Sequence, residues 1–201
     1  AAACAPFPES LRTGEPVEAK SAITIADGIA VKRPGTLTLP LLAALVDDMV
    51  VVGEDATAEA IALLLERCKL VVEGAGAVGV AALLGGEVKP AADGVTVAVL
   101  SGGNIDAGLL AAIARRHETI SGRRLILLTR IPDRPGGLAR LLAAVAETGA
   151  NIVDVSHVRE GLDLHVRETA VELVLETRGH DHAQEVLATL RDKGYAAQVL
   201  R

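Results

Sequence analysis

The chain has 201 residues, enough for one large domain or two small ones at roughly 150 residues per domain. Half of the residues are hydrophobic and the mean hydropathy is +0.39, which is the composition of a globular chain and not of a disordered one. The net charge of −6 and the 1% of aromatic residues argue against nucleic-acid binding, which depends on basic and stacking side chains.

Membrane insertion and secretion are also disfavoured. The uncharged stretch near the middle of the chain, residues 74–86, falls well short of the roughly 20 apolar residues that a membrane-spanning helix requires. Cys4 and Cys68 stand far apart and form no CxxC motif, which favours a reducing, cytoplasmic location. The chain begins at Ala1, its one methionine is Met49, and no signal or transit peptide is recognisable, so we expect a fragment or processed piece.

Helices and buried strands alternate through the first half of the chain. Proline and glycine break residues 1–36 into loops around a short helix. Apolar spacing then predicts, in chain order, a helix from Thr38, a strand over 50–52, a helix capped by Asp55, a helix over 76–84, a strand over 95–100 and a helix over 106–117. This alternation predicts an α/β domain with a parallel sheet.

The pattern changes after residue 117. Residues 118–122 are polar, and we take them as a linker between a first domain over 1–117 and a second over 123–201. The second domain has the predicted order βαββαβ, with strands over 124–130, 151–158, 167–177 and 195–200 and helices over 137–148 and 182–193. This order is that of the ferredoxin-like split βαβ fold, whose sheet has helices on one face. Because the other face needs a cover, we expect a homo-oligomer.

Three short motifs of the first domain contain glycine beside polar residues. One, Ser101-Gly102-Gly103-Asn104, follows a predicted buried strand, whose carboxyl end opens onto the ligand crevice of an α/β sheet. Two glycines there let the backbone approach a bound ring or anion, although a plain strand-to-helix turn would use them equally well. The other two motifs are Ile25-Ala26-Asp27-Gly28 and Glu73-Gly74-Ala75-Gly76, and each alone is weak.

Taken together, segments 24–35, 73–79 and 100–104 closely resemble, in content, order and spacing, the C-terminal half of the pyridoxal-phosphate-dependent threonine dehydratases, or threonine ammonia-lyases. Serine dehydratases and serine racemases belong to the same group. The resemblance covers residues 9 to about 117. It implies part of a fold-type II (tryptophan synthase β-like) catalytic domain with pyridoxal phosphate (PLP) as cofactor.

The resemblance also implies roles for individual residues. Ser101 would hydrogen-bond the pyridine nitrogen, Gly28 would lie against the ring face, and Glu73 would lie near the cofactor. The implied cofactor site is completed by Gly102, Gly103 and Asn104. Because a hydroxyl does not hold a proton on that nitrogen as a carboxylate would, the ring is a weaker electron sink, which suits β-elimination better than transamination.

Other parts of the family's site have no counterpart in this chain. The resemblance implies that the Schiff-base lysine and the phosphate-binding loop lie upstream of residue 1. None of the five lysines matches the lysine motif: Lys20, Lys32, Lys69, Lys89 and Lys193. We therefore expect no catalytic residue in this chain and no turnover by the chain alone. The group's metal-binding stretch would fall at the start, where Pro6 replaces an acidic position, so we predict no metal.

The second half resembles an ACT domain, a small amino-acid-sensing module. The resemblance rests on Asp133-Arg134-Pro135-Gly136-Gly137-Leu138 and on Gly149-Ala150-Asn151-Ile152. A helix that begins after Pro-Gly-Gly offers free N–H groups and the positive end of its dipole to a ligand carboxylate. We therefore predict a regulatory site for isoleucine or valine, made of Asp133, Gly136, Gly137, Leu138, Asn151 and Ile152. Alternatively, the glycines only make a tight turn and the domain serves for dimerisation.

Three other features have simpler explanations. His180-Asp181-His182 offers too few ligands for a metal. Lys32 and Arg33 fit a solvated loop pair better than an anion site, and Cys68 fits a small buried hydrophobe.

The sequence thus predicts the C-terminal part of a cytoplasmic L-threonine or L-serine ammonia-lyase. The enzyme would convert threonine to 2-oxobutanoate and ammonia by PLP-dependent α,β-elimination, a reaction suited to isoleucine biosynthesis. An ACT domain would regulate it allosterically, and the assembly would be a dimer or tetramer with neither nucleic acid nor membrane as partner. The alternative is a non-catalytic module that binds an amino acid and dimerises.

Overall fold

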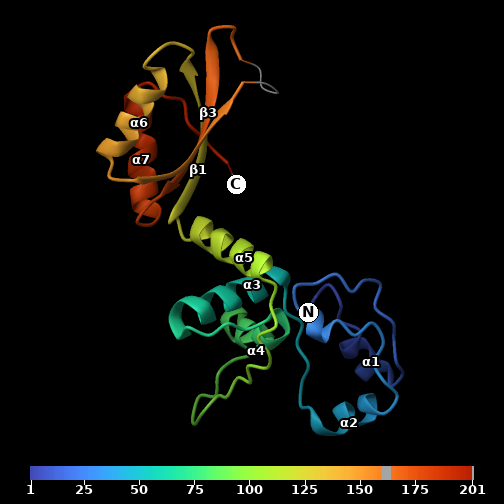
Figure 1. Ribbon diagram of the computed structural model, residues 1–201. Helices are drawn as coiled ribbons and strands as arrows, with labels where there is room; N and C mark the ends of the chain where they lie inside the picture. The colour runs from blue at the N-terminus through green and yellow to red at the C-terminus, as the bar shows by residue number, and fades with distance from the viewer. Residues whose placement is uncertain (160–163, 201) are drawn as a thin grey trace. The chain divides into compact units, whose positions relative to one another are not determined.

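The computed structural model describes residues 1–159 and 164–200 (Figure 1). The chain divides into two compact units, Ala1–Ala114 and Arg115–Arg201. The division falls inside helix α5 (Ala107–Ile120), so the first three residues of the expected linker, 118–120, are helical. Among the described residues, no helix has both the length and the apolar character needed to cross a membrane.

The first unit is built from helices and connecting loops. Its elements before α5 are α1 (Phe7–Thr13), the short 3-10 helix η1 (Asp27–Ile29), α2 (Thr38–Leu45), α3 (Glu54–Leu63), the π-helical turn η2 (Leu64–Cys68) and α4 (Gly74–Gly85). The predicted helices are confirmed, with small shifts at their ends. Gly53, and not Asp55, precedes the first turn of α3.

The expectation that Cys68 is buried is wrong. Cys68 is exposed because the last turn of its helix is a π-turn, which holds more residues than an α-turn and rotates the side chain off the apolar face. Leu64, at the start of that turn, is still buried.

Helices α3 and α4 pack together to form the core of the first unit. Both helices present small side chains, and Ala60, Ala77 and Ala81 have no exposed surface. Such residues let two helices approach closely, because no bulky side chain separates their backbones. Ile113 of α5 packs against the same cluster.

The two strands expected in the first unit do not form. Residues 50–52 and 95–100 belong to no β-ladder, and the sheet that the described residues contain lies wholly beyond residue 123. A continuous apolar run becomes a buried parallel strand only where other strands flank it. Here Val52 accepts one bond, from the N–H of Ala2 at 2.8 Å, while Val95, Val97 and Val99 are largely exposed.

The second unit has the expected ferredoxin-like fold. Its elements are β1 (Arg124–Pro132), α6 (Gly137–Glu147), β2 (Asn151–Val158), β3 (Glu168–Glu176), α7 (His180–Asp192) and β4 (Gln198–Val199). The strand order is β2-β3-β1-β4 and each pair of neighbours is antiparallel, which confirms the predicted βαββαβ arrangement. Both helices lie on one face of the sheet (Figure 1). β4 is shorter than the expected strand over 195–200.

The core of the second unit lies between that sheet face and the two helices. Alternate residues of β1 are buried, as the sequence pattern predicts for a strand with one covered face. Leu127 and Leu173 of the sheet, Leu141 of α6 and Leu190 of α7 have no exposed surface. The opposite face of the sheet has no covering element among the described residues.

Candidate functional site

The three glycine-containing motifs of the first unit meet at the start of α4. A Cβ atom at Gly74 would overlap the carbonyl oxygen of Ile25, and one at Gly76 would overlap that of Ser101. The first turn of α4 therefore touches the backbone of both other motifs. Only glycine permits so close an approach, which explains why small residues open this helix.

The carboxylate of Glu73 lies at the centre of this meeting point. It accepts a hydrogen bond from the N–H of Asn104 at 3.0 Å, and the N–H of Glu73 donates to the carbonyl of Gly102 at 3.3 Å. Cβ atoms built at Gly102 and Gly28 would lie 2.5 Å and 3.2 Å from its Oε1 atom. Residues from three distant parts of the sequence thus surround one half-buried carboxylate.

The backbone around Ser101 leaves room for a ligand. Ser101 is exposed, and its hydroxyl has no hydrogen-bond partner in the part of the chain that the structure describes. The absence of side chains at Gly28 and Gly102 lets Glu73 and Ala75 lie close to the backbone there. The exposed Ser101 hydroxyl, with no partner of its own in the described residues, fits the ring nitrogen of pyridoxal phosphate. Gly103 is crowded as well, because a Cβ there would lie 2.8 Å from the carbonyl oxygen of Val71.

One segment of this site is positioned by a residue that belongs to none of the sequence motifs. The carboxylate of Glu54, in the first turn of α3, accepts bonds from the Thr24 hydroxyl at 2.5 Å and from the Ile25 N–H at 2.8 Å. These bonds fix the segment that leads to Gly28. Thirty residues separate Glu54 from Thr24, so no local spacing pattern could have revealed the contact.

The second unit has a cavity of about 370 Å³ at the end of β1 and the start of α6. Its lining includes Asp133, Gly136 and Leu138, which the sequence predicted, and also His157 and Thr169, which it did not. Strands β2 and β3 supply the added residues, and the sequence gives no sign that they face the Pro-Gly-Gly turn.

Arg159 forms an ion pair with Asp133 beside this cavity. Its guanidinium donates to the two carboxylate oxygens at 2.8 Å and 3.3 Å. These hydrogen bonds hold the pKa of Asp133 below its usual value, and the charges of Arg159 and His157 add to the effect. The Asp133 carboxylate, which lines the cavity, is thus ionised and paired with Arg159.

The structure does not bring all six predicted regulatory residues together. Asn151 pairs with Glu176 at the end of the sheet where β1 begins, whereas Gly137 packs against Pro132, where β1 ends. At roughly 3.3 Å per residue, these ends lie about 26 Å apart. The Asn151 side chain donates to the Glu176 carboxylate at 3.1 Å, and the neighbouring Ile152 packs on the core.

Gly137 has a different role from the expected one. Its N–H donates to the carbonyl of Arg134 at 2.9 Å and is not free for a ligand. Within one chain, Asn151, Ile152 and Gly137 therefore lie outside the cavity that Asp133 and Gly136 border.

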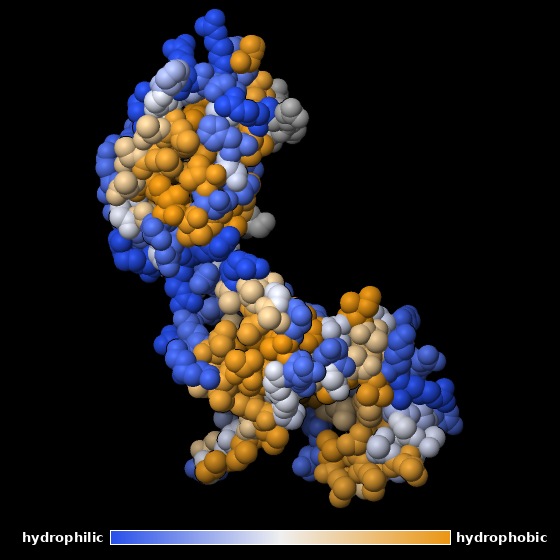
Figure 2. Space-filling model, in the orientation of Figure 1, coloured by the Kyte–Doolittle hydropathy of each residue, from blue (hydrophilic) through white to orange (hydrophobic). Residues whose placement is uncertain are grey.

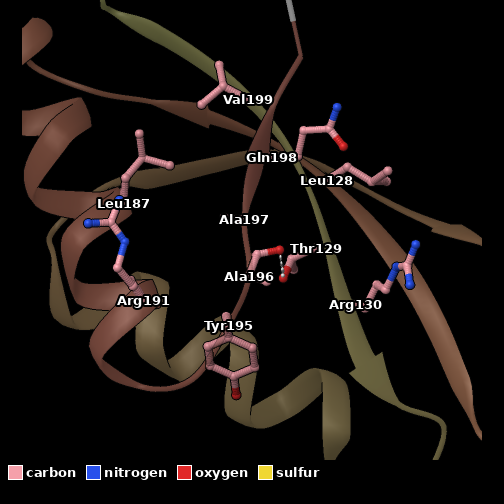
Figure 3. Close-up of a pocket in the computed structure, with 10 residues that line it drawn as sticks. All are labelled: Leu128, Thr129, Arg130, Leu187, Arg191, Tyr195, Ala196, Ala197, Gln198 and Val199. Carbon is pink, nitrogen blue, oxygen red and sulfur yellow. Dashed lines mark hydrogen bonds between the residues drawn. The ribbon is translucent and has the colours of Figure 1, made fainter.

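A larger cavity of about 750 Å³ surrounds β4 but gathers few polar groups (Figure 3). Arg130 and Arg191 lie on opposite sides of the strand and do not converge. The Thr129 hydroxyl is already bonded to the carbonyl of Ala196, at 3.2 Å. Tyr195 lines the cavity beside α7, with its hydroxyl directed away from the two arginines. This arrangement offers a small ligand no common point of attachment.

No three His, Cys, Asp or Glu side chains gather into a possible metal site within residues 1–159 and 164–200. His182, from the His180-Asp181-His182 run, is buried and bonded to the backbone on both sides. The N–H of Arg178 donates to its Nδ1 atom at 3.1 Å, so its Nε2 atom carries the proton that is shared with the carbonyl of Thr148 at 2.8 Å.

Comparison with known families agrees with this geometry. Residues 1–102 match the family described as pyridoxal-phosphate dependent enzyme, and residues 125–194 match the ACT domain. The first match covers half of the chain, so the chain belongs to the pyridoxal-phosphate dependent enzyme family, with an ACT domain following the matched part.

Two curated relatives are similar to almost the whole of this chain. The chain is 47% identical over 192 residues to the L-threonine ammonia-lyase of Geobacter sulfurreducens, covering 96% of this chain and 48% of the relative. It is 44% identical to the L-threonine ammonia-lyase of Thermotoga maritima, covering 95% and 47%. The chain thus spans about half the length of these curated relatives.

Two solved structures are also similar in part. One is a threonine deaminase from the organism abbreviated T.th., at 35% identity and a TM-score of 0.45, covering 52% of this chain and 38% of that chain. The other is maize serine racemase, at 33% identity and a TM-score of 0.49, covering 59% and 37%.

Proposed function

We propose that this chain is the C-terminal part of an L-threonine ammonia-lyase that also accepts L-serine and is regulated through its ACT domain. The complete enzyme converts L-threonine to 2-oxobutanoate and ammonia in the cytoplasm. The observation that carries the proposal is the meeting of Gly28, Glu73, Ser101 and Asn104 at the start of α4. The names of the two bacterial relatives support the choice of substrate.

Each of these residues has a distinct role in the proposed enzyme. Pyridoxal phosphate, when bound, supplies the electron sink that makes the α-proton of the substrate acidic. The Ser101 hydroxyl would bond the ring nitrogen without keeping it protonated, which would favour loss of the β-hydroxyl. Gly28 would lie against the ring face, Gly102 leaves room for the Glu73 carboxylate, and Glu73 holds the Ser101 loop through the N–H of Asn104.

The proposal also covers the two strands expected in the first unit. Segments 50–52 and 95–100 line one apolar cavity of about 510 Å³ over α4, together with Ala75 and Val78. We propose that they become parallel strands when the other half of the catalytic domain fills this cavity. That half would also carry the Schiff-base lysine and the phosphate-binding loop.

The proposed effector site is the cavity beside Asp133, Gly136 and Leu138. The start of α6 attracts a carboxylate, Asp133 attracts an ammonium group, and Leu138 and Leu142 border an aliphatic side chain such as that of isoleucine or valine. The other three predicted residues of this site, Gly137, Asn151 and Ile152, would take part only through a second copy of the chain.

Activity of the full-length enzyme tests the proposal. Enzyme that carries this chain should release 2-oxobutanoate and ammonia from L-threonine, while this chain alone with added pyridoxal phosphate should release neither. Borohydride reduction of the mixture should label no single lysine stoichiometrically. Stoichiometric labelling of one lysine of this chain would place the catalytic residue here and contradict the proposal.

Ser101→Ala in the full-length enzyme tests the cofactor site. The variant loses a hydrogen bond of roughly 1 kcal/mol, so cofactor affinity and kcat should both fall. Ser121→Ala is the matched control, because the Ser121 hydroxyl bonds only the carbonyl of Glu118 outside the site. If both variants bind the cofactor like the unchanged enzyme, the assignment of Ser101 is wrong.

A further inference from the structure

The segment that leads to Gly28 is held on one side by the start of α3. The Thr24 hydroxyl and the Ile25 N–H both donate to the Glu54 carboxylate, at 2.5 Å and 2.8 Å. The Thr24 hydroxyl also accepts a bond from the N–H of Ala26, at 3.1 Å. One carboxylate thus fixes three consecutive residues, two of them directly and the third through the hydroxyl.

The other side of this segment lies against the start of α4. The heavy atoms nearest to a Cβ built at Gly74 belong to the backbone of Ile25 and Ala26. Ala26 has no exposed surface. The segment is therefore confined between two helix starts, hydrogen-bonded to one and packed against the other.

Gly28 lies in the 3-10 turn that follows directly. Ala26 precedes the first residue of this turn, and its carbonyl accepts the N–H of Ile29 at 3.1 Å. The turn brings Gly28 to Glu73, so that a Cβ at Gly28 would lie 3.2 Å from the Oε1 atom of Glu73. Because the turn starts from a residue that Glu54 helps to hold, the position of Gly28 depends on the Glu54 carboxylate.

The surroundings strengthen the bonds to Glu54. Glu54 and Thr24 are half-buried, and the surface over α3 and α4 is largely hydrophobic (Figure 2). Hydrogen bonds are stronger in such surroundings than in open water. Glu54 also lies in the first turn of α3, where the helix dipole favours negative charge. A carboxylate is therefore better suited to this position than a neutral side chain.

We propose that Glu54 is a positioning residue of the catalytic domain, which acts on the cofactor site by fixing residues 24–28 and with them Gly28. Glu73 does the same for the Ser101 loop, since each carboxylate lies at the start of a helix and accepts a backbone N–H from a distant loop. The inference rests on the proposed function, in which Gly28 lies against the cofactor ring. Glu54 acts through this segment and needs no contact with cofactor or substrate.

Hydrogen exchange tests whether the carboxylate holds the segment. In Glu54→Gln the amide keeps one acceptor oxygen but presents a donor to the second partner, so one of the two bonds is lost. Residues 24–28 of the full-length enzyme, measured without added cofactor, should then exchange about tenfold faster. Residues 101–104, which Glu73 holds, should be unchanged. Equal exchange of residues 24–28 in Glu54→Gln and the unchanged enzyme would overturn the proposal.

Glu59→Gln is the matched control. Glu59 is an exposed residue of the same helix, so the same chemical change there should leave the exchange of both segments unaltered.

Cofactor binding tests whether the segment positions Gly28. The Kd of pyridoxal phosphate for the full-length enzyme should be about tenfold higher with Glu54→Gln, and unchanged with Glu59→Gln. At saturating cofactor, the visible circular dichroism of the bound cofactor should also change in Glu54→Gln, because the ring then lies differently in its asymmetric site. A role in helix stability alone would lower Tm and leave this signal unchanged.

Thr24→Val tests the hydroxyl that Glu54 holds. Valine keeps the shape of threonine but cannot bond Glu54 or Ala26, so the variant should raise the Kd of the cofactor as Glu54→Gln does. Because both changes disrupt one contact, the double variant should raise the Kd by less than the product of the two single effects. Effects that multiply would show that the two residues act independently, against the proposal.

Two negative results are distinguishable. If the unchanged enzyme binds no pyridoxal phosphate, the proposed function fails and this inference fails with it. If the unchanged enzyme binds the cofactor, and Glu54→Gln binds it with the same Kd and the same visible circular dichroism, the inference alone is wrong.

Discussion

At the scale of single residues, the carboxylate of Glu73 occupies the space beside Gly102 that a side chain would otherwise take. Gly102 also has a positive φ of 81°, which L-residues rarely adopt. Gly14 has nearly the same backbone conformation, with φ of 77°, but no atom lies within 4 Å of its Cβ position. Substituting these two glycines therefore distinguishes the cost of backbone strain from the cost of crowding by a neighbouring side chain.

Gly14→Ala should cost about 1–2 kcal/mol of unfolding free energy, the usual strain of a left-handed residue. Gly102→Ala should cost more, because the added methyl group also displaces the Glu73 carboxylate. Chemical denaturation of the two variants measures the difference. Adding Glu73→Ala to Gly102→Ala should reduce this excess cost, because the crowding carboxylate is then absent. Equal unfolding free energies for Gly14→Ala and Gly102→Ala would show that Glu73 does not crowd position 102.

The ion pair between Asp133 and Arg159 predicts a particular pH dependence. The pKa of Asp133 is lowered by hydrogen bonds from Arg159, so the pair adds stability that is complete above the unfolded pKa near 3.9. This stability is lost as the pH falls through the lower, folded-state pKa. Asp133→Asn should therefore lower Tm by a constant amount from pH 8 to about pH 5.

Below about pH 4 the melting curves of Asp133→Asn and the unchanged chain should converge. Arg159→Gln should show the same pH profile because it removes the same pair, and the double variant should add nothing. A difference in Tm that persists undiminished at pH 2 would mean that Asp133 acts through another contact.

At the scale of elements, His182 joins two turns of the ACT unit. It connects Arg178, before α7, to Thr148, after α6, through one hydrogen bond on each ring nitrogen. His182→Ala should leave a buried donor and a buried acceptor unpaired, at a cost of about 2 kcal/mol. For a unit of this size, Tm should fall by roughly 10 °C.

His180→Ala, at an exposed position on the same helix, is the control and should change Tm little. Hydrogen exchange on the His182→Ala variant should show faster opening at the Thr148 and Arg178 turns than in the middle of β3. Uniform exchange across the unit would indicate a loss of packing instead of a loss of these two bonds.

The elements of the second unit could be predicted because each has one buried face, so the sequence alternates where the fold requires it. The strands of the first unit could not, since a run such as Val95–Leu100 shows that a segment is apolar but not whether neighbouring strands are in place. Site residues followed the same rule. Motifs could single out Gly28, Glu73 and Ser101 as candidates, whereas Glu54 and Arg159 act across long sequence separations and carry no local pattern.

Asn151 shows that closeness in sequence does not give closeness in the fold of one chain. Its motif lies close in sequence to the turn at Gly136, but helix α6 lies between them. The chain has therefore reached the other end of the sheet before Asn151 begins β2.

At the scale of the whole molecule, each unit has its own hydrophobic core, so a ligand that binds one unit should stabilise that unit alone. Isoleucine or valine at 100 times its Kd should raise the unfolding free energy of the ACT unit by about 2.7 kcal/mol. Thermal unfolding should then show one transition that moves and one that does not.

Ala139→Asp should abolish this shift, because it places a carboxylate in the lining of the cavity where the ligand carboxylate would bind. Ala143→Asp, one turn further along α6 and outside the lining, should preserve the shift. If no amino acid moves either transition of the folded protein, the ACT unit acts only in assembly.

The location of Tyr195 has a spectroscopic consequence. The chain has one tyrosine, one phenylalanine and no tryptophan, and the tyrosine lies half-buried beside the cavity around β4. Intrinsic emission excited in the near ultraviolet therefore arises from the ACT unit, whereas the far-ultraviolet signal arises from helices of both units. Recording the two signals during one temperature ramp would give the order in which the units unfold, with no label attached and no residue replaced.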